Sequence, residues 1–128
     1  MQYAPVVGRV LFSAIFIMFG FGHLFDAGSM TAIVPDFLPM KTVVVMLTGV
    51  VIVAGGLMVL LGYRAKLAGK ILFVFMFVTA ISVWSGGFMD GDQVSTAMFM
   101  KDLALSGASL MIAHFGAGPM SMDAKAEA

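Results

Sequence analysis

The chain has 128 residues, of which 61% are hydrophobic and only 11% are charged. Soluble domains carry about 45–50% apolar and about 25% charged residues, so this composition excludes a soluble globular domain and a disordered chain. Seven basic and seven acidic residues cancel, and no basic run is present, which argues against nucleic-acid binding. The absence of cysteine excludes disulfides, iron–sulfur clusters and thiol relays within this sequence.

Four apolar stretches are long enough to cross a bilayer, which requires about 20 residues of helix. They predict spans over residues 4–25, 42–63, 67–86 and 97–115. Helix breakers lie at the ends of the last three: Gly62, the pair Gly86 and Gly87, and residues 116–119. The sequence therefore predicts an all-α membrane protein, an antiparallel bundle of four transmembrane helices that forms a single domain over residues 1–128.

The connections between the predicted spans differ in length and polarity. A tight basic connection covers residues 62–66, and an acidic connection covers residues 87–96. The longest connection, residues 26–41, carries apolar side chains between two prolines. We expect it either to lie along the membrane interface or simply to cover the end of the bundle.

Basic residues predict the orientation of the bundle. One side of the membrane would hold Arg9, Arg64, Lys66, Lys70 and Lys125, and the other side would hold Lys41 and Lys101. Because basic residues gather on the cytoplasmic side, this distribution places both termini in the cytoplasm.

Polar residues inside the spans fall on two helical faces. In the first span, Arg9, Ser13 and Gly20 share one face, which His23 continues. In the fourth span, Ser106 and Ser109 share a face with Asp102. An ionisable group costs about 2.5–3.5 kcal/mol at the centre of a span, so we expect the face of the first span to point toward the fourth helix or another protein surface rather than lipid. The similar face of the fourth span should point into the bundle. Arg9 could instead reach the headgroups along its own stem.

A second group of polar residues lies near the outer end of the predicted bundle. It comprises His23, Trp84, Lys101 and Asp102, and we call it the outer polar cluster. Adjacent residues on a helix point in different directions, so we expect Lys101 and Asp102 to find separate partners. The alternative is an interfacial belt, with Trp84 at the level of the headgroups and the charges in water.

The sequence predicts no catalytic residue and no metal site. His23 and His114 fall at opposite ends of the predicted bundle, so they cannot ligate one haem iron from its two sides. A metal-transport site would need methionine pairs at helical spacing, and the thirteen methionines form none. We interpret them as packing residues.

Three segments resemble the DoxX family of small four-span bacterial membrane proteins, over nearly the whole chain. The first is Gly8-Arg9-Val10-Leu11 continuing to Phe19-Gly20-Phe21-Gly22-His23-Leu24, and the second is the tight loop from Leu61 to Ala68. The third is the run Met100 to Gly107 followed by Gly116 to Asp123. Asp102 stands where the family usually has Asn.

The resemblance implies a bacterial inner membrane protein associated with redox systems. Some relatives resemble subunits of thiosulfate:quinone oxidoreductases, and others accompany a superoxide dismutase and a sulfurtransferase. More distant animal relatives resemble receptor-assembly chaperones. The family therefore does not fix one activity.

We predict an accessory or assembly subunit without chemistry of its own, which docks in a larger membrane complex and requires no cofactor. The alternative is a quinone-binding subunit whose partner holds the redox centre, with the outer polar cluster around the quinone headgroup. Homo-oligomers are also compatible with the small residues on the spans. A small multidrug transporter is disfavoured, because such proteins rely on a carboxylate deep in the first span and none is present here.

Overall fold

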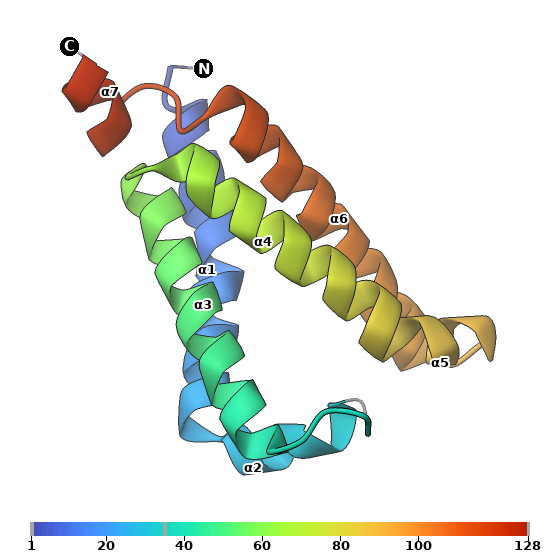
Figure 1. Ribbon diagram of the computed structural model, residues 1–128. Helices are drawn as coiled ribbons and strands as arrows, with labels where there is room; N and C mark the ends of the chain where they lie inside the picture. The colour runs from blue at the N-terminus through green and yellow to red at the C-terminus, as the bar shows by residue number, and fades with distance from the viewer. Residues whose placement is uncertain (1, 35, 128) are drawn as a thin grey trace.

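The computed structural model describes residues 2–34 and 36–127, and within them the chain is helical with no strand. The elements are α1 (Ala4–Phe25), α2 (Ala27–Met30), η1 (Thr31–Ile33), α3 (Lys41–Leu61), α4 (Ala65–Thr79), η2 (Ala80–Trp84), α5 (Ser85–Met89), α6 (Gln93–Phe115) and α7 (Met122–Glu127). Figure 1 shows their arrangement. The all-α prediction is confirmed for the described residues.

Three of the described helical segments are long and apolar enough to cross a membrane: Ala4–Phe25, Lys41–Leu61 and the continuous run Ala65–Met89. They correspond to the first three predicted spans. The fourth predicted span lies in α6, which is a long helix but is less apolar than the other three and does not meet the same test. A bundle of four spans is therefore only partly supported.

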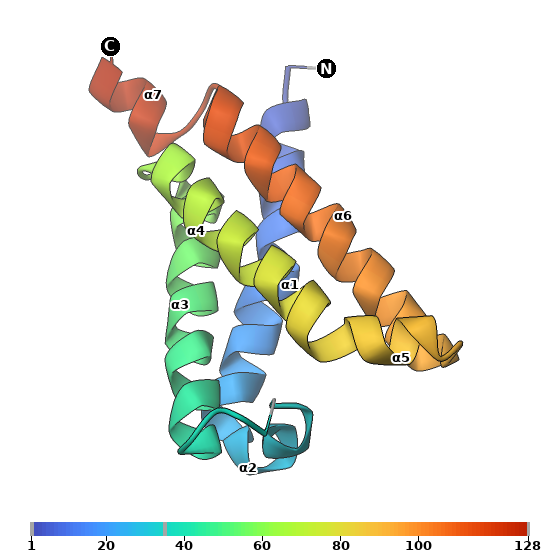
Figure 2. The ribbon, with the colours of Figure 1, turned by 45° about the vertical axis from the view of Figure 1, so that its right-hand side comes forward.

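The long helices form two antiparallel hairpins. Helix α1 packs against α3, and α4 packs against α6, while the contact between α3 and α4 is smaller. The two hairpins meet at the end that carries both termini and diverge toward the end that carries α2 and α5 (Figures 1 and 2). We call these the closed end and the open end.

The closed end is held by the segment that follows α6. Asp123 accepts hydrogen bonds from the backbone N–H groups of Arg64 (2.8 Å) and Ala65 (2.9 Å), and its own N–H donates to the carbonyl of Gly62 (2.9 Å). This carboxylate therefore supplies the N-terminal cap of α4, whose own first residues offer no side-chain cap. We call this contact the clasp.

Arg9 attaches α1 to the same segment. Its Nη2 donates to the carbonyl of Met120 at 2.7 Å and approaches that of Pro119 at 3.5 Å. Gly62 ends α3 with a left-handed backbone (φ 71°) and lies where a side chain would meet Arg9 and Ser121. The closed end thus brings together parts of all three segments that resemble the DoxX family.

The apolar core lies between α1, α3 and α4 in the middle of the molecule. Its buried members are Phe16, Ile52, Val59, Ala68, Leu72 and Met76. In the second hairpin, Gly69 allows α4 to approach α6 closely, because a Cβ there would lie 2.7 Å from the backbone nitrogen of Ala113 and the backbone oxygen of Ser109.

Two predictions about the third connection are wrong. The third helical run does not stop at Gly86 and Gly87 but continues to Met89, and α6 begins at Gln93. The connection therefore shrinks from the predicted 87–96 to residues 90–92. The physical reason is packing: a side chain at Gly87 would collide with that of Ser95 on α6, so this glycine permits helix contact rather than ending the helix.

The long connection after α1 crosses the open end of the molecule. It begins with the short helices α2 and η1 and then turns back to the start of α3 (Figure 1). Val34, Phe37 and Leu38 from this connection line a cavity between the hairpins. Whether the connection also lies along a membrane interface stays a prediction.

Candidate functional site: a cavity between the two hairpins

The divergence of the hairpins leaves two neighbouring cavities toward the open end. The larger has a volume of about 520 Å³ and is lined mainly by apolar side chains of α3 and α4, with contributions from the long connection and from His23. The smaller has a volume of about 150 Å³ and is lined by residues of α1, α3, α4, η2 and α6. His23, Phe75 and Thr79 line both cavities, so the two meet at these side chains.

The structure brings all four members of the outer polar cluster to the smaller cavity. His23 lies on α1, Trp84 on η2, and Lys101 and Asp102 on α6. The remaining lining is apolar or aromatic, apart from the hydroxyl of Thr79. A mostly apolar cavity with a few convergent polar groups is typical of a binding site for a small molecule.

His23 is held by a hydroxyl of the neighbouring helix. Its Nδ1 lies 3.2 Å from Oγ1 of Thr48 on α3, and that hydroxyl donates to the carbonyl of Val45 at 2.8 Å. These bonds fix the orientation of the imidazole ring at the junction of the two cavities. The ring also has the backbone of Val45 as a hydrogen-bond partner, so both partners lie on α3.

Lys101 and Asp102 pair with each other, which corrects the prediction that they could not. The Lys101 Nζ lies 3.7 Å from Oδ1 of Asp102, and it also contacts the sulfur of Met98 at 3.6 Å. Although the two Cα–Cβ bonds diverge, the long lysine stem folds back toward the neighbouring carboxylate. The ammonium also lies 4.7 Å from the ring centroid of Phe19 on α1, so this pair reaches across the gap between the hairpins.

Trp84 reaches the cavity through an irregularity in its helix. The segment η2, Ala80–Trp84, is π-helical and joins α4 to α5 without interrupting the helical run. In a π-helix, residues five positions apart share a face, so Thr79 and Trp84 both line the smaller cavity. Segments of this kind occur frequently at functional sites.

The second set of predicted residues lies apart from the cavities. Arg9, Ser13 and Gly20 are buried residues of α1, and Ser106 and Ser109 are buried residues of α6, but none of them lines either cavity. Gly20 packs against the side chains of Ile52 and Val53 on α3 rather than against α6.

The serine hydroxyls of these buried residues either form a hydrogen bond within their own helix or have no described partner. Ser106 donates to the carbonyl of Leu103 and Ser109 to that of Leu105, both within α6. Among the described residues, the Ser13 hydroxyl and the Nε and Nη1 atoms of Arg9 are buried without a hydrogen-bond partner. These residues serve helix packing and the closed end rather than a shared site.

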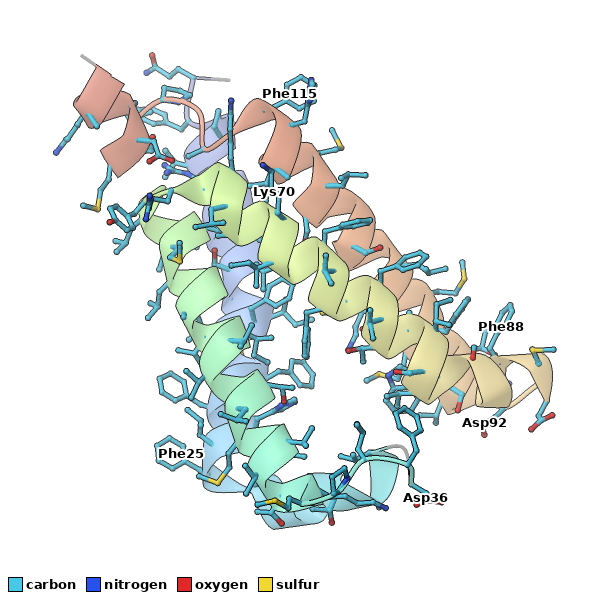
Figure 3. All side chains as sticks on the ribbon, in the orientation of Figure 1. Phe25, Asp36, Lys70, Phe88, Asp92 and Phe115 are labelled. Carbon is cyan, nitrogen blue, oxygen red and sulfur yellow. The ribbon has the colours of Figure 1, made fainter. Side chains whose placement is uncertain are left out.

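The two histidines occupy opposite ends of the molecule. His23 precedes Phe25 by two residues and His114 precedes Phe115, and Figure 3 shows these two phenylalanines at the open and closed ends. Within residues 2–34 and 36–127, no three histidine or acidic side chains are placed to hold a metal ion.

Among the lining residues that sequence reasoning missed are Thr48, Phe75 and Thr79. The two threonines carried a signal that was available, since each places a hydroxyl within an apolar run. Phe75 has no such signal, because aromatic residues are common throughout these helices. Only the packing of the hairpins selects it.

A small helical protein with three apolar helices of membrane-spanning length and a cavity between two hairpins belongs to the class of multi-pass membrane proteins. The DoxX family model matches residues 4–85, and the chain belongs to this family. The chain is also similar to the protein named inner membrane protein YqjF of Escherichia coli (strain K12), with 33% identity over 123 residues, 92% of this chain and 88% of the relative. No solved structure matches the chain.

Proposed function

We propose that this chain is a non-catalytic subunit of a bacterial inner membrane complex. It binds a lipid-soluble quinone between its two hairpins, while a partner protein holds the redox centre. The observation that carries the proposal is the smaller cavity, where His23, Trp84, Lys101 and Asp102 meet beside the larger apolar cavity.

The two cavities suit the two parts of a quinone. The smaller, about 150 Å³, offers aromatic walls and polar groups to a ring. The larger, about 520 Å³, offers apolar side chains to a hydrocarbon tail. Because His23, Phe75 and Thr79 line both, a ring in one cavity has a direct route for its tail into the other.

The burial of the acidic residue favours a ligand over direct protein docking at this cluster. The side chain of Asp102 is only 3% exposed, and that of Lys101 is 30% exposed. A partner protein could not reach the carboxylate without separating the hairpins, whereas a small molecule in the cavity meets it directly. We therefore expect the partner protein to bind at other surfaces of the bundle.

We place this subunit in the membrane with α6 as a fourth span and with both termini in the cytoplasm. Helix α6 has 23 residues, which corresponds to about 34 Å at 1.5 Å per residue, enough for a hydrocarbon core of about 30 Å. It lies against α4 with its ion pair turned into the cavity rather than outward. The name of the E. coli relative supports the inner membrane, and the basic residues near the closed end support the orientation.

The topology is tested by labelling, because the chain has no cysteine of its own. A cysteine introduced as Gly91→Cys should react with a membrane-impermeant reagent in intact cells, and one introduced as Ala126→Cys should react only after the cells are opened. The reverse pattern would contradict the orientation, and labelling of both in intact cells would contradict the fourth span.

Quinone binding is tested with Trp84, which is the single tryptophan of the chain and lines the cavity. A decyl-tailed benzoquinone should quench its fluorescence saturably in the purified, detergent-solubilised protein. Leu105→Phe places a larger side chain of α6 in the cavity and should weaken quinone binding by about tenfold. A tenfold change in affinity corresponds to about 1.4 kcal/mol of binding free energy.

Leu110→Phe is the matched control, because Leu110 lies on the same helix and is exposed. It should bind like the unmodified protein. Quenching that rises linearly in all three proteins would reflect partition into detergent and would contradict the proposal. Oxidation or reduction of the quinone by the purified chain alone would contradict its non-catalytic role.

A further inference from the structure

We infer that the smaller cavity selects the reduced, hydroxyl-bearing form of its ring ligand, a hydroquinone, over the oxidised quinone. This inference rests on the proposed function and adds the chemical form of the ligand. It follows from the hydrogen-bond partners of His23 and from the ion pair of Lys101 and Asp102.

The first step concerns the position of one proton. The Oγ1 of Thr48 lies 2.8 Å from the carbonyl oxygen of Val45, and two oxygens at this distance require a proton between them. A carbonyl carries none, so the threonine hydroxyl donates to Val45. A hydroxyl has a single proton to donate, and Thr48 can therefore meet Nδ1 of His23 only as an acceptor.

The second step gives the tautomer of His23. Because Thr48 accepts, Nδ1 carries the proton, at a separation of 3.2 Å. In a neutral imidazole the other nitrogen is then an acceptor. The partners that the structure gives the ring, the Thr48 hydroxyl and the backbone carbonyl of Val45, both lie on α3 and both accept, and His23 lines the cavity, so Nε2 is the acceptor that the ring offers a ligand.

The third step concerns Asp102, on the opposite hairpin. Its polar partner in the described part of the chain is Lys101, at 3.7 Å, and its side chain is nearly buried. A carboxylate paired with an ammonium accepts hydrogen bonds and donates none. Asp102 also lines the smaller cavity, which therefore presents acceptors from both hairpins.

These acceptors distinguish the two forms of the ligand. A hydroxyl donates to an acceptor and still accepts from a donor such as the Lys101 ammonium. A quinone carbonyl only accepts, so its binding would leave the acceptors buried and unpaired, which is costly. A cationic ligand is disfavoured as well, because the charges of Lys101 and Asp102 cancel within the cavity.

The test compares decyl-hydroquinone with decyl-quinone, which have the same tail and nearly the same shape. Binding is measured as ligand-dependent thermal stabilisation of the purified protein. The hydroquinone should bind about tenfold more tightly, which corresponds to one additional hydrogen bond. A protein without cysteine tolerates the reductant that keeps the hydroquinone reduced.

Two variants of Thr48 examine the tautomer itself. Thr48→Val removes one of the two acceptors on α3 that favour a proton on Nδ1, so the preference for hydroquinone should fall while the quinone affinity is kept. Thr48→Ser retains the hydroxyl and should restore the preference. His23→Leu should remove the preference by weakening only the hydroquinone.

The results separate this inference from the proposed function. Saturable binding of both forms with equal affinity, or tighter binding of the quinone, would overturn the inference and leave the proposed function standing. Tighter binding of a decyl amine than of the hydroquinone would overturn it in favour of a cationic ligand. Absence of saturable binding by any probe would overturn both.

Discussion

The two ends of this molecule handle polar groups in different ways. At the closed end, Asp123 and Arg9 bind backbone groups of distant segments and hold three parts of the chain together. At the open end, His23, Lys101 and Asp102 come from both hairpins and line the smaller cavity. The closed end thus joins segments of the chain, whereas the open end carries the cavity that we propose as a ligand site.

The difference also explains why the hairpins diverge. Toward the closed end, the absence of a side chain at Gly62 lets the end of α3 approach Arg9 and Ser121. Toward the open end, bulky side chains such as Phe75 and Trp84 and the long connection keep the hairpins apart. The same antiparallel packing thus yields one end where the hairpins meet and one where they diverge around the two cavities.

The largest expected effect comes from overpacking the second hairpin. Gly69→Ala would place a methyl group 2.7 Å from the backbone of α6, and we expect it to lower the free energy of unfolding in detergent by about 1–3 kcal/mol. Gly107→Ala is the control, because no atom lies within 4 Å of a Cβ there, and helix propensity alone should stabilise it by up to about 1 kcal/mol. Equal effects of the two substitutions would contradict close packing at Gly69.

An intermediate effect should follow from opening the clasp. Asp123→Ala removes the acceptor of two backbone N–H groups at the start of α4, and we expect a loss of about 1–2 kcal/mol in the free energy of unfolding. Hydrogen exchange should become faster at the amides of residues 64 and 65 and not in the middle of α6. Asp90→Ala, at an exposed position of the open end, should leave both measurements unchanged. Unaltered exchange in Asp123→Ala would show that the clasp does not hold the closed end.

The smallest effect concerns the cap of α6 at the open end. Hydrogen bonds from the side chain and the backbone N–H of Ser95 hold the pKa of the exposed Asp92 carboxyl below its usual range. Because the pKa is lower in the folded protein, this cap stabilises it above the pKa of the unfolded chain, and the contribution is lost as the pH falls through the folded pKa. A carboxyl titration by NMR should show the lowered value, and Ser95→Ala should raise it.

Asp92→Asn provides the control for that assignment. Asparagine also caps helices, so the variant should keep α6 intact and lose the small pH dependence that the carboxylate contributes. An Asp92 titration at the ordinary aspartate value in the unmodified protein would contradict the cap.

Much of the fold could be predicted from local sequence. The lengths of the apolar runs predicted the three helices that are long enough to cross a membrane, and Gly62 correctly marked the end of α3. The end of the third helical run was misjudged, because Gly87 serves a contact with Ser95 that no local pattern reveals. The pairing of Lys101 with Asp102 was missed for a related reason, since direction along a helix does not limit where a long side chain ends.

The sequence by itself determined the class of this protein, because hydrophobicity and helix length are properties of consecutive residues. Position near the outer ends of the predicted spans also selected the residues of the outer polar cluster. Only the tertiary structure decided that these residues share a cavity, that Thr48 lies within hydrogen-bond distance of His23, and that Arg9 and Asp123 belong to the closed end. Those features depend on the angle between two hairpins, which is set by contacts between residues far apart in the chain, such as Gly62 with Ser121 and Arg9 with Met120.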